Sequence, residues 1–182
     1  MDAAFIFSLM LSALLLIAMV TDATRYTIPN WINGLIVILY VLMFAAVPAA
    51  ASVSWLEGLY GFASVFAVGY VIFLFNIMGG GDIKLLSVLA LWTGFSMTLG
   101  SFILFCAIIG GFLTLILIFL RIIAPFVVNY LPSKPHLPRV LSFGEPLPYG
   151  LAIATSFLML LWTDQIPGLA GVKAQALIWL SF

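Results

Sequence analysis

The chain has 182 residues, of which 65% are hydrophobic and only 7% are charged. Soluble domains carry about 25% charged residues, so this composition, with a mean hydropathy of +1.32, predicts an integral membrane protein. Six basic and six acidic residues balance without forming a basic patch, which argues against a nucleic-acid partner. The single cysteine, Cys106, and the single histidine, His136, leave no disulfide framework and no Cys/His metal cluster, so we expect neither metal nor cofactor.

Six apolar runs follow one another along the chain, most of them near the ~20 residues that cross a bilayer and the fourth and sixth shorter. The first begins at the N-terminus, where Met1 to Ala4 lack the positive region of a cleavable signal peptide, so we interpret it as a retained helix. The predicted spans are residues 3–20, 31–47, 59–77, 85–99, 101–120 and 149–163. The sequence therefore predicts an all-α, polytopic protein with about six transmembrane helices and a single domain over residues 1–182.

Two segments differ from the apolar runs. Residues 131–148 hold five of the nine prolines and form the longest polar loop, near which we expect the substrate entrance. Residues 165–182 are of mixed character and too short for a further span, and they are consistent with a segment lying in the membrane interface.

The positions of lysine and arginine predict the orientation, because cytoplasmic loops are enriched in these residues. In the six-span scheme only Lys173 lies on the other side from the remaining five, which are Arg25, Lys84, Arg121, Lys134 and Arg139. We therefore expect their side to be cytoplasmic and the N-terminus to be outside.

Two aspartates come at the ends of apolar runs. Asp22 follows the first run and Asp82 precedes the fourth, with two complete spans between them, so both carboxyl groups emerge at the same membrane face. Two carboxyls that share a site do not readily both ionise, so one keeps a proton while the other can act as base on a water. The pair therefore predicts acid–base chemistry that needs no metal.

Three consecutive glycines, Gly79, Gly80 and Gly81, stand directly before Asp82. Because glycine has no side chain, another chain can approach closely beside this carboxyl, and the backbone can take conformations with positive φ.

Plainer interpretations apply to several of these residues. Asp82 alone could serve as a helix cap, whereas Asp22 at a helix C-terminus faces the negative end of the dipole and is harder to explain structurally, unless Arg25 pairs with it at the surface. Lys84 is interpreted first as an anchor that reaches the interface. Other polar or small residues are expected to serve interhelical hydrogen bonding or close packing: Asn30, Asn33, Asn76, Gly58, Gly61, Gly110 and Gly111.

Three blocks of the sequence resemble the type IV prepilin peptidases, which are intramembrane aspartic proteases of the GxGD type. Residues 79–85 match the family pattern G-x-G-D-x-K-L, and Asp22 followed by Ile28-Pro29-Asn30 is similar to its first aspartate with a downstream I/L-P-N. Residues 145–152 resemble the proline, aromatic, glycine and alanine pattern that opens the family's last span.

The resemblance implies that Asp22 and Asp82 are the catalytic pair, supported by Gly79, Gly80, Gly81, Lys84, Pro29 and Asn30. It also implies a substrate, the basic leader of a prepilin or pseudopilin, and a place in the bacterial inner membrane with the active site facing the cytoplasm. Longer members carry a segment with paired Cys-x-x-Cys motifs and also methylate the product. This chain resembles the short branch that serves Flp or Tad-type pili, for which we expect proteolysis alone.

Two other hypotheses remain open at this stage. A small proton- or cation-coupled transporter could use Asp22 and Asp82 as an ion site, with residues 79–81 as the unwound break of a transporter helix. A scaffold subunit without chemistry would leave the two aspartates as a coincidence. The sequence does not indicate the oligomeric state.

Overall fold

The computed structural model describes residues 2–46, 54–130, 141, 147–169, 171 and 176–177, and for residues 126–130 it describes the backbone alone. Within these residues the secondary structure is helical, without strands. Six helices follow one another: α1 (Ala3–Arg25), α2 (Asn30–Ala46), α3 (Trp55–Leu74), α4 (Gly80–Thr93), α5 (Met97–Tyr130) and α6 (Tyr149–Trp162). Each corresponds to one predicted apolar run.

Three segments are long and apolar enough to cross a membrane: Ala3–Arg25, Trp55–Leu74 and Met97–Pro125. The helices Asn30–Ala46 and Tyr149–Trp162 are apolar but shorter. Together with the outward-facing leucine, isoleucine and phenylalanine side chains of α5, these features confirm the predicted class, an all-α, polytopic membrane protein.

The helices that carry the two aspartates end at other residues than predicted. α1 continues past Asp22 and ends where Tyr26 adopts a left-handed φ of 53°, with its N–H donating to the Asp22 carbonyl oxygen at 2.9 Å. α4 stops at Thr93, because Gly94 turns the chain with a φ of +63°. The expectation of a fourth span reaching residue 99 was therefore wrong.

The glycine stretch is more regular than the sequence suggested. Gly80 and Gly81 form the first turn of α4, and Gly79 occupies the N-cap with a φ of −68°. None of the three has a positive φ. The positive φ that glycine permits is therefore not used here, because Gly80 and Gly81 begin a helix, and a Cβ atom on either would make only ordinary contacts, at 3.5 Å with Phe73 and 3.6 Å with Ile28.

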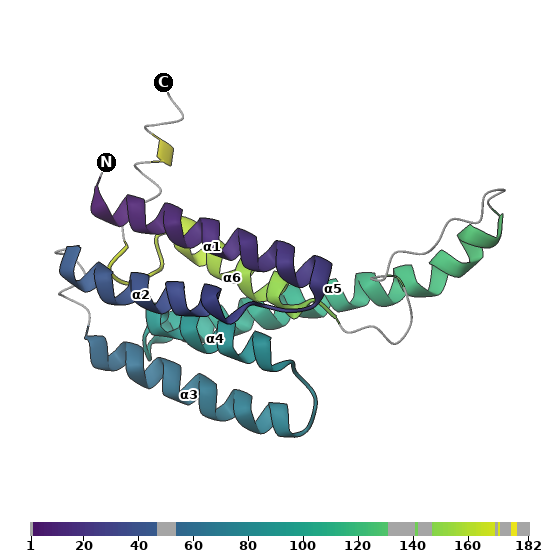
Figure 1. Cartoon of the computed structure of the whole chain (residues 1–182), viewed down its shortest axis with the longest axis horizontal. Coiled ribbons are helices and arrows are strands. Elements are labelled where there is room, and N and C mark those ends of the chain that lie inside the picture. The colour runs from purple at the N-terminus through teal and green to yellow at the C-terminus, as the bar shows by residue number, and fades with distance from the viewer. Residues whose placement is uncertain are drawn as a thin grey trace.

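Helix α4 lies at the centre of the bundle, between α2 and α3 in Figure 1. It packs most extensively on α3 and also contacts α2, α5 and α6, while α1 packs against α2 and α6. The part of α5 beyond the bundle extends away from the other helices (Figure 1). All the elements that carry the predicted site residues therefore meet on or around α4.

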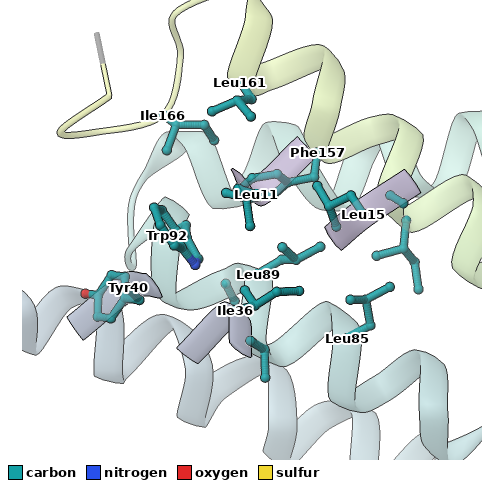
Figure 2. Packing of buried hydrophobic residues seen from close by; sticks show 14 of the residues in the cluster. Leu11, Leu15, Ile36, Tyr40, Leu85, Leu89, Trp92, Phe157, Leu161 and Ile166 are labelled. Atoms are coloured by element: carbon teal, nitrogen blue, oxygen red, sulfur yellow. The ribbon is translucent and has the colours of Figure 1, made fainter. Parts of the chain in front are cut away.

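The core fills the space between α1, α2, α4 and α6 (Figure 2). Trp92 of α4 packs edge-on against Tyr40 of α2 at a ring-centroid distance of 5.6 Å, and Phe102 of α5 packs similarly on Phe157 of α6 at 5.5 Å. Lipid tails are as apolar as these side chains, so close van der Waals packing has to stabilise the bundle. The other buried side chains that Figure 2 labels are Leu11, Leu15, Ile36, Leu85, Leu89, Leu161 and Ile166.

Small residues bring α3 close to α4. A Cβ atom on Gly61 would lie 2.7 Å from the carbonyl oxygen of Ala90, and one on Gly58 would lie 2.8 Å from that of Leu91. The predicted packing role of Gly58 and Gly61 is therefore confirmed. Gly111 faces open space instead, so packing does not account for it.

Most of the predicted polar loop, residues 131–140 and 142–146, lies outside the described residues. So do residue 170, residues 172–175 and residues 178–182 of the tail.

Candidate active site

Asp22 and Asp82 lie in one cavity of about 770 Å³ at one end of the bundle. Asp22 sits in the last turn of α1 and is only 4% exposed, whereas Asp82 sits in the first turn of α4 and is partly buried. The two carboxyl groups are close enough for the charge of Asp22 to act on Asp82. The structure thus brings together the two side chains that the sequence placed at one membrane face.

Five parts of the chain enclose the cavity. They are the end of α1 with the loop to α2, the end of α3 with the following glycine stretch, the start of α4, residue Arg121 of α5, and the start of α6. Because its wall comes from both ends of the sequence, the cavity exists only in the folded bundle.

The N-terminus of α6 points at both aspartates. The backbone N–H groups of Gly150 and Leu151 face the Asp22 carboxyl, and the Gly150 N–H also faces the Asp82 carboxyl together with that of Gly79. The start of a helix carries free N–H donors and partial positive charge, so it stabilises an anion there. Gly150 is thus placed to stabilise the one negative charge that the pair would share.

Two side-chain ends lie close to where a Cβ atom on Gly150 would stand. A Cβ atom at this position would lie 2.8 Å from Oδ2 of Asp22 and 2.8 Å from Cδ1 of Ile28. Separations below 3.0 Å are not tolerated without a shift of one partner. The absence of a side chain at Gly150 therefore allows α6 to approach the carboxyl group.

One oxygen of the pair remains available. Oδ2 of Asp22 is buried and has no hydrogen-bond partner of good geometry among the described residues. A buried carboxyl oxygen without a partner is costly, and such groups often belong to functional sites. This oxygen can accept a proton or a hydrogen bond from a water or a substrate in the cavity.

The loop after α1 holds Asp22 next to the glycine stretch. A Cβ atom on Gly81 would lie 3.6 Å from the backbone nitrogen and from Cβ of Ile28, so Ile28 packs directly over this helical turn. The Pro29 carbonyl accepts the N–H of Ile32 at 3.1 Å and so begins α2. Gly81 and Ile28 together fix the distance between the start of α4 and the end of α1.

A hydrogen bond joins α2 to α4 beside the cavity. Nζ of Lys84 donates to Oδ1 of Asn30 at 3.1 Å, and both residues line the cavity. The expected role of Lys84 as a free interfacial anchor is incomplete, because its ammonium group has a protein partner. Asn30 and Lys84 therefore act as a link between two helix N-termini.

Two features of the cavity were not recognised from the sequence. Arg121, interpreted from the sequence only as one of the basic residues that indicate the orientation, is 8% exposed and lines the cavity. Its position at the end of a long apolar run was the available signal, since ionisable residues at membrane depth are usually functional. The backbone N–H groups of Gly150 and Leu151 could not be recognised from the sequence, because a backbone donor does not depend on the type of side chain.

Three further polar residues, Asn76, Asn33 and Arg25, differ in burial and in their position relative to the cavity. Asn76 is exposed at the cavity with a φ of 55°, and Asn33 is buried with neither side-chain polar atom paired among the described residues. The expected interhelical hydrogen bonds of Asn33 are thus not formed. Arg25 is exposed and does not line the cavity, so a surface ion pair does not explain the burial of Asp22.

The described residues contain no group of three or more histidine, cysteine, aspartate or glutamate side chains that could hold a metal ion. Asp22 and Asp82 therefore form a pair of carboxyls without further acidic ligands beside them in this part of the chain.

The fold and the cavity define a class: helical membrane proteins with two carboxyl groups from different helices at one end of the bundle. A family model described as the type IV leader peptidase family matches residues 9–118, which include both aspartates and the glycine stretch. The chain belongs to this family, so the predicted family is confirmed and the protein is a peptidase at the level of its family; the match includes the first two sequence blocks, whereas residues 145–152 lie beyond it. No curated protein and no solved structure matches the chain.

Proposed function

We propose that this protein is an aspartic endopeptidase of the bacterial inner membrane that removes the leader peptide of prepilins or pseudopilins, with Asp22 and Asp82 as its catalytic residues. The observation that carries the proposal is the convergence of both carboxyls and the N-terminus of α6 on one cavity. Family membership supports the peptidase activity, and the resemblance of the three sequence blocks supports the Flp-type substrate.

The arrangement supports a reaction through one shared proton. One carboxylate takes a proton from a water while the protonated carboxyl donates its own to the carbonyl oxygen of the scissile peptide, and the water oxygen bonds to the carbonyl carbon. Collapse of this tetrahedral intermediate breaks the C–N bond, and the leaving nitrogen takes a proton from the pair. The two products are a new carboxyl group on the leader and a new amino group on the mature protein.

The surrounding residues have positioning roles in this proposal. The Gly150 N–H and the positive end of α6 stabilise the single negative charge of the pair throughout the reaction. Arg121 adds a buried cation to the same cavity, where it stabilises the negative charge that develops on the peptide carbonyl oxygen in the transition state. Gly79, Gly80, Gly81 and Pro29 shape the wall, and Asn30 with Lys84 joins two of its helices.

We place the active site at the cytoplasmic face, because Arg25, Lys84 and Arg121 all lie at the end of the bundle that holds the cavity. The N-terminus is then outside the cytoplasm.

One argument for the proton- or cation-coupled transporter does not hold. It required an unwound helix at residues 79–81, but Gly80 and Gly81 are helical. A transporter site also lies near the midplane, whereas Asp22 and Asp82 lie at helix ends.

The proposal is tested by replacing Asp22 and Asp82 with asparagine, singly and together. Each single variant is expected to lose at least about a thousandfold in leader cleavage, and the double variant hardly more, because residues that act as a unit are not additive. The assay follows cleavage of a purified prepilin in detergent or liposomes without an ion gradient. Uncut prepilin with the wild-type protein, or an Asp22→Asn variant that keeps most activity, would falsify the proposal.

A further inference from the structure

A second hollow opens on the side of the bundle where α2 and α3 face each other across α4. It has a volume of about 230 Å³ and is lined by Val37 and Gly34 of α2, Phe62 and Phe66 of α3, and Val88 of α4, with Asn33 and Lys84 at its edge. α2 and α3 each pack on α4 but make no extensive contact with each other, so the hollow lies open to the bilayer between them.

The hollow adjoins the catalytic cavity. Lys84 lines both, and the hydrogen bond from Lys84 to Asn30 lies between them. Gly34 and Val37 follow Asn30 by one and two helical turns, so the hollow reaches about 6 to 10 Å from the catalytic end along the bundle axis. A chain that leaves the catalytic cavity toward the membrane interior therefore meets this hollow first.

The two walls of the hollow differ in shape, and the difference suits the docking of a helix between them. On α3, Phe62, Phe66 and Tyr70 stack at one-turn intervals, with ring centroids 5.8 and 6.4 Å apart. On α2, a Cβ atom at Gly34 would meet no atom within 4 Å, so the opposite wall has a notch. Small residues that let a second backbone approach, opposite larger apolar side chains, are typical of helix association in membranes.

We infer that this hollow, named here the α2–α3 groove, docks the apolar membrane helix that adjoins the scissile bond of the substrate. The inference rests on the proposed function, since a peptidase whose site lies at a membrane face must take a substrate held by the same membrane. The groove accepts one or two apolar side chains of that helix as anchors, as in other helix-in-groove interactions. The bond beside the helix is thereby held at the mouth of the catalytic cavity.

Filling the groove tests the inference without disturbing the enzyme's own packing. A Gly34→Phe ring would enter open space, and Gly111→Phe on α5 is the matched control, since a Cβ atom there also meets nothing within 4 Å. We expect Gly34→Phe to raise the KM for a full-length prepilin in liposomes by about tenfold, the effect of one anchor losing its pocket, and Gly111→Phe to leave it unchanged.

A shortened substrate separates docking from catalysis. A soluble peptide that ends one residue after the scissile bond is too short to reach the groove, since one extended residue spans about 3.5 Å, so wild-type protein and Gly34→Phe should cut it at equal rates. Equal losses on the full-length and shortened substrates, or no loss on either, would overturn the inference.

Photocrosslinking identifies the occupant directly. A photoreactive amino acid replaces Phe66 in the groove or, as a control, Phe119, which is 62% exposed on α5, each combined with Asp82→Asn to retain the substrate. An adduct with prepilin at residue 66 and not at 119 is the expected result. If wild-type protein cuts the substrate but both positions form adducts only with lipid, the docking role of the groove is overturned and the proposed function is not. If wild-type protein does not cut the substrate, the proposed function itself is overturned.

Discussion

Gly150 shows how a residue without a side chain can organise the pair of aspartates that we propose to be catalytic. Its N–H faces Asp22 and Asp82 together, and its missing Cβ leaves room for Oδ2 of Asp22. Electrostatic stabilisation by fixed backbone donors needs no rearrangement during a reaction, which is why such donors are effective. The role of Gly150 thus depends on its exact place at the start of α6.

Replacing Gly150 with alanine should therefore reduce activity more than stability. The added Cβ must displace the Asp22 carboxyl or α6, and we expect cleavage to fall by about 10²-fold, the usual cost of losing one such donor. Gly110→Ala is the control, because its Cβ would make only ordinary contacts at 3.6 Å with Ala152 and Tyr149. Equal kcat values for the two variants, measured at equal protein accumulation, would contradict this role.

The aspartates could be predicted from sequence, but their surroundings could not. Asp22 and Asp82 stand out because a charge at the edge of an apolar run is unusual, and an even number of spans between them fixes a common face. A backbone donor such as the Gly150 N–H leaves no trace in residue type. The burial of Arg121 depends on how α5 packs, which a single apolar run does not indicate.

At the scale of helices, the hydrogen bond from Lys84 to Asn30 joins the N-termini of α2 and α4. If this link positions the α1–α2 loop, Asn30→Ala and Lys84→Met should each lower cleavage several-fold, and the double variant should be no worse than the more severe single one. Asn76→Ala with Lys84→Met is the control pair and should be additive. Additive losses for Asn30 and Lys84 would show that the hydrogen bond does not couple them.

The contact between α3 and α4 depends on glycine. Gly61→Val would force side-chain atoms against the Ala90 carbonyl, and overpacking of this kind typically costs about 1–3 kcal/mol. The same change at Gly100, where a Cβ meets nothing within 4 Å, is the control for the β-branched residue itself. We expect thermal unfolding in detergent at a clearly lower temperature for Gly61→Val alone; matching melting curves would refute the packing role.

Helix positions were predictable where the apolar runs are long, and boundaries were not. α2 follows its predicted run within a residue at each end, whereas α5 continues to Tyr130, well beyond the predicted end at residue 120, and α4 includes two glycines and ends six residues early, at Thr93 and not at Leu99. Glycine is compatible with both a break and a close helix contact. Here Gly80 and Gly81 are helical, and Ile28, which lies beside Gly81, is far from it in the sequence, so sequence pattern alone could not show the arrangement.

For the whole molecule, the proposed orientation predicts two opposite labelling patterns. With Cys106 replaced by alanine, a cysteine at the exposed position Thr27 marks the catalytic end, and one at exposed Ser54 marks the other end. In intact cells a membrane-impermeant maleimide should label Ser54→Cys and spare Thr27→Cys, and in inverted vesicles the pattern should reverse. Labelling of Thr27→Cys from outside the cell would place the cavity at the outer face of the membrane and contradict the proposed orientation.

The short helices α4 and α6 have a consequence for the surrounding membrane. Each has 14 residues and therefore a length of about 21 Å, against a hydrocarbon thickness of about 30 Å. Both begin at the cavity that holds the two aspartates, so when their far ends meet one interface, Asp82 lies roughly 9 Å beneath the other, or the lipid becomes thinner there. Either way, hydrophobic mismatch brings water and a membrane-embedded peptide bond to the same depth, which a protein with uniformly long helices could not do.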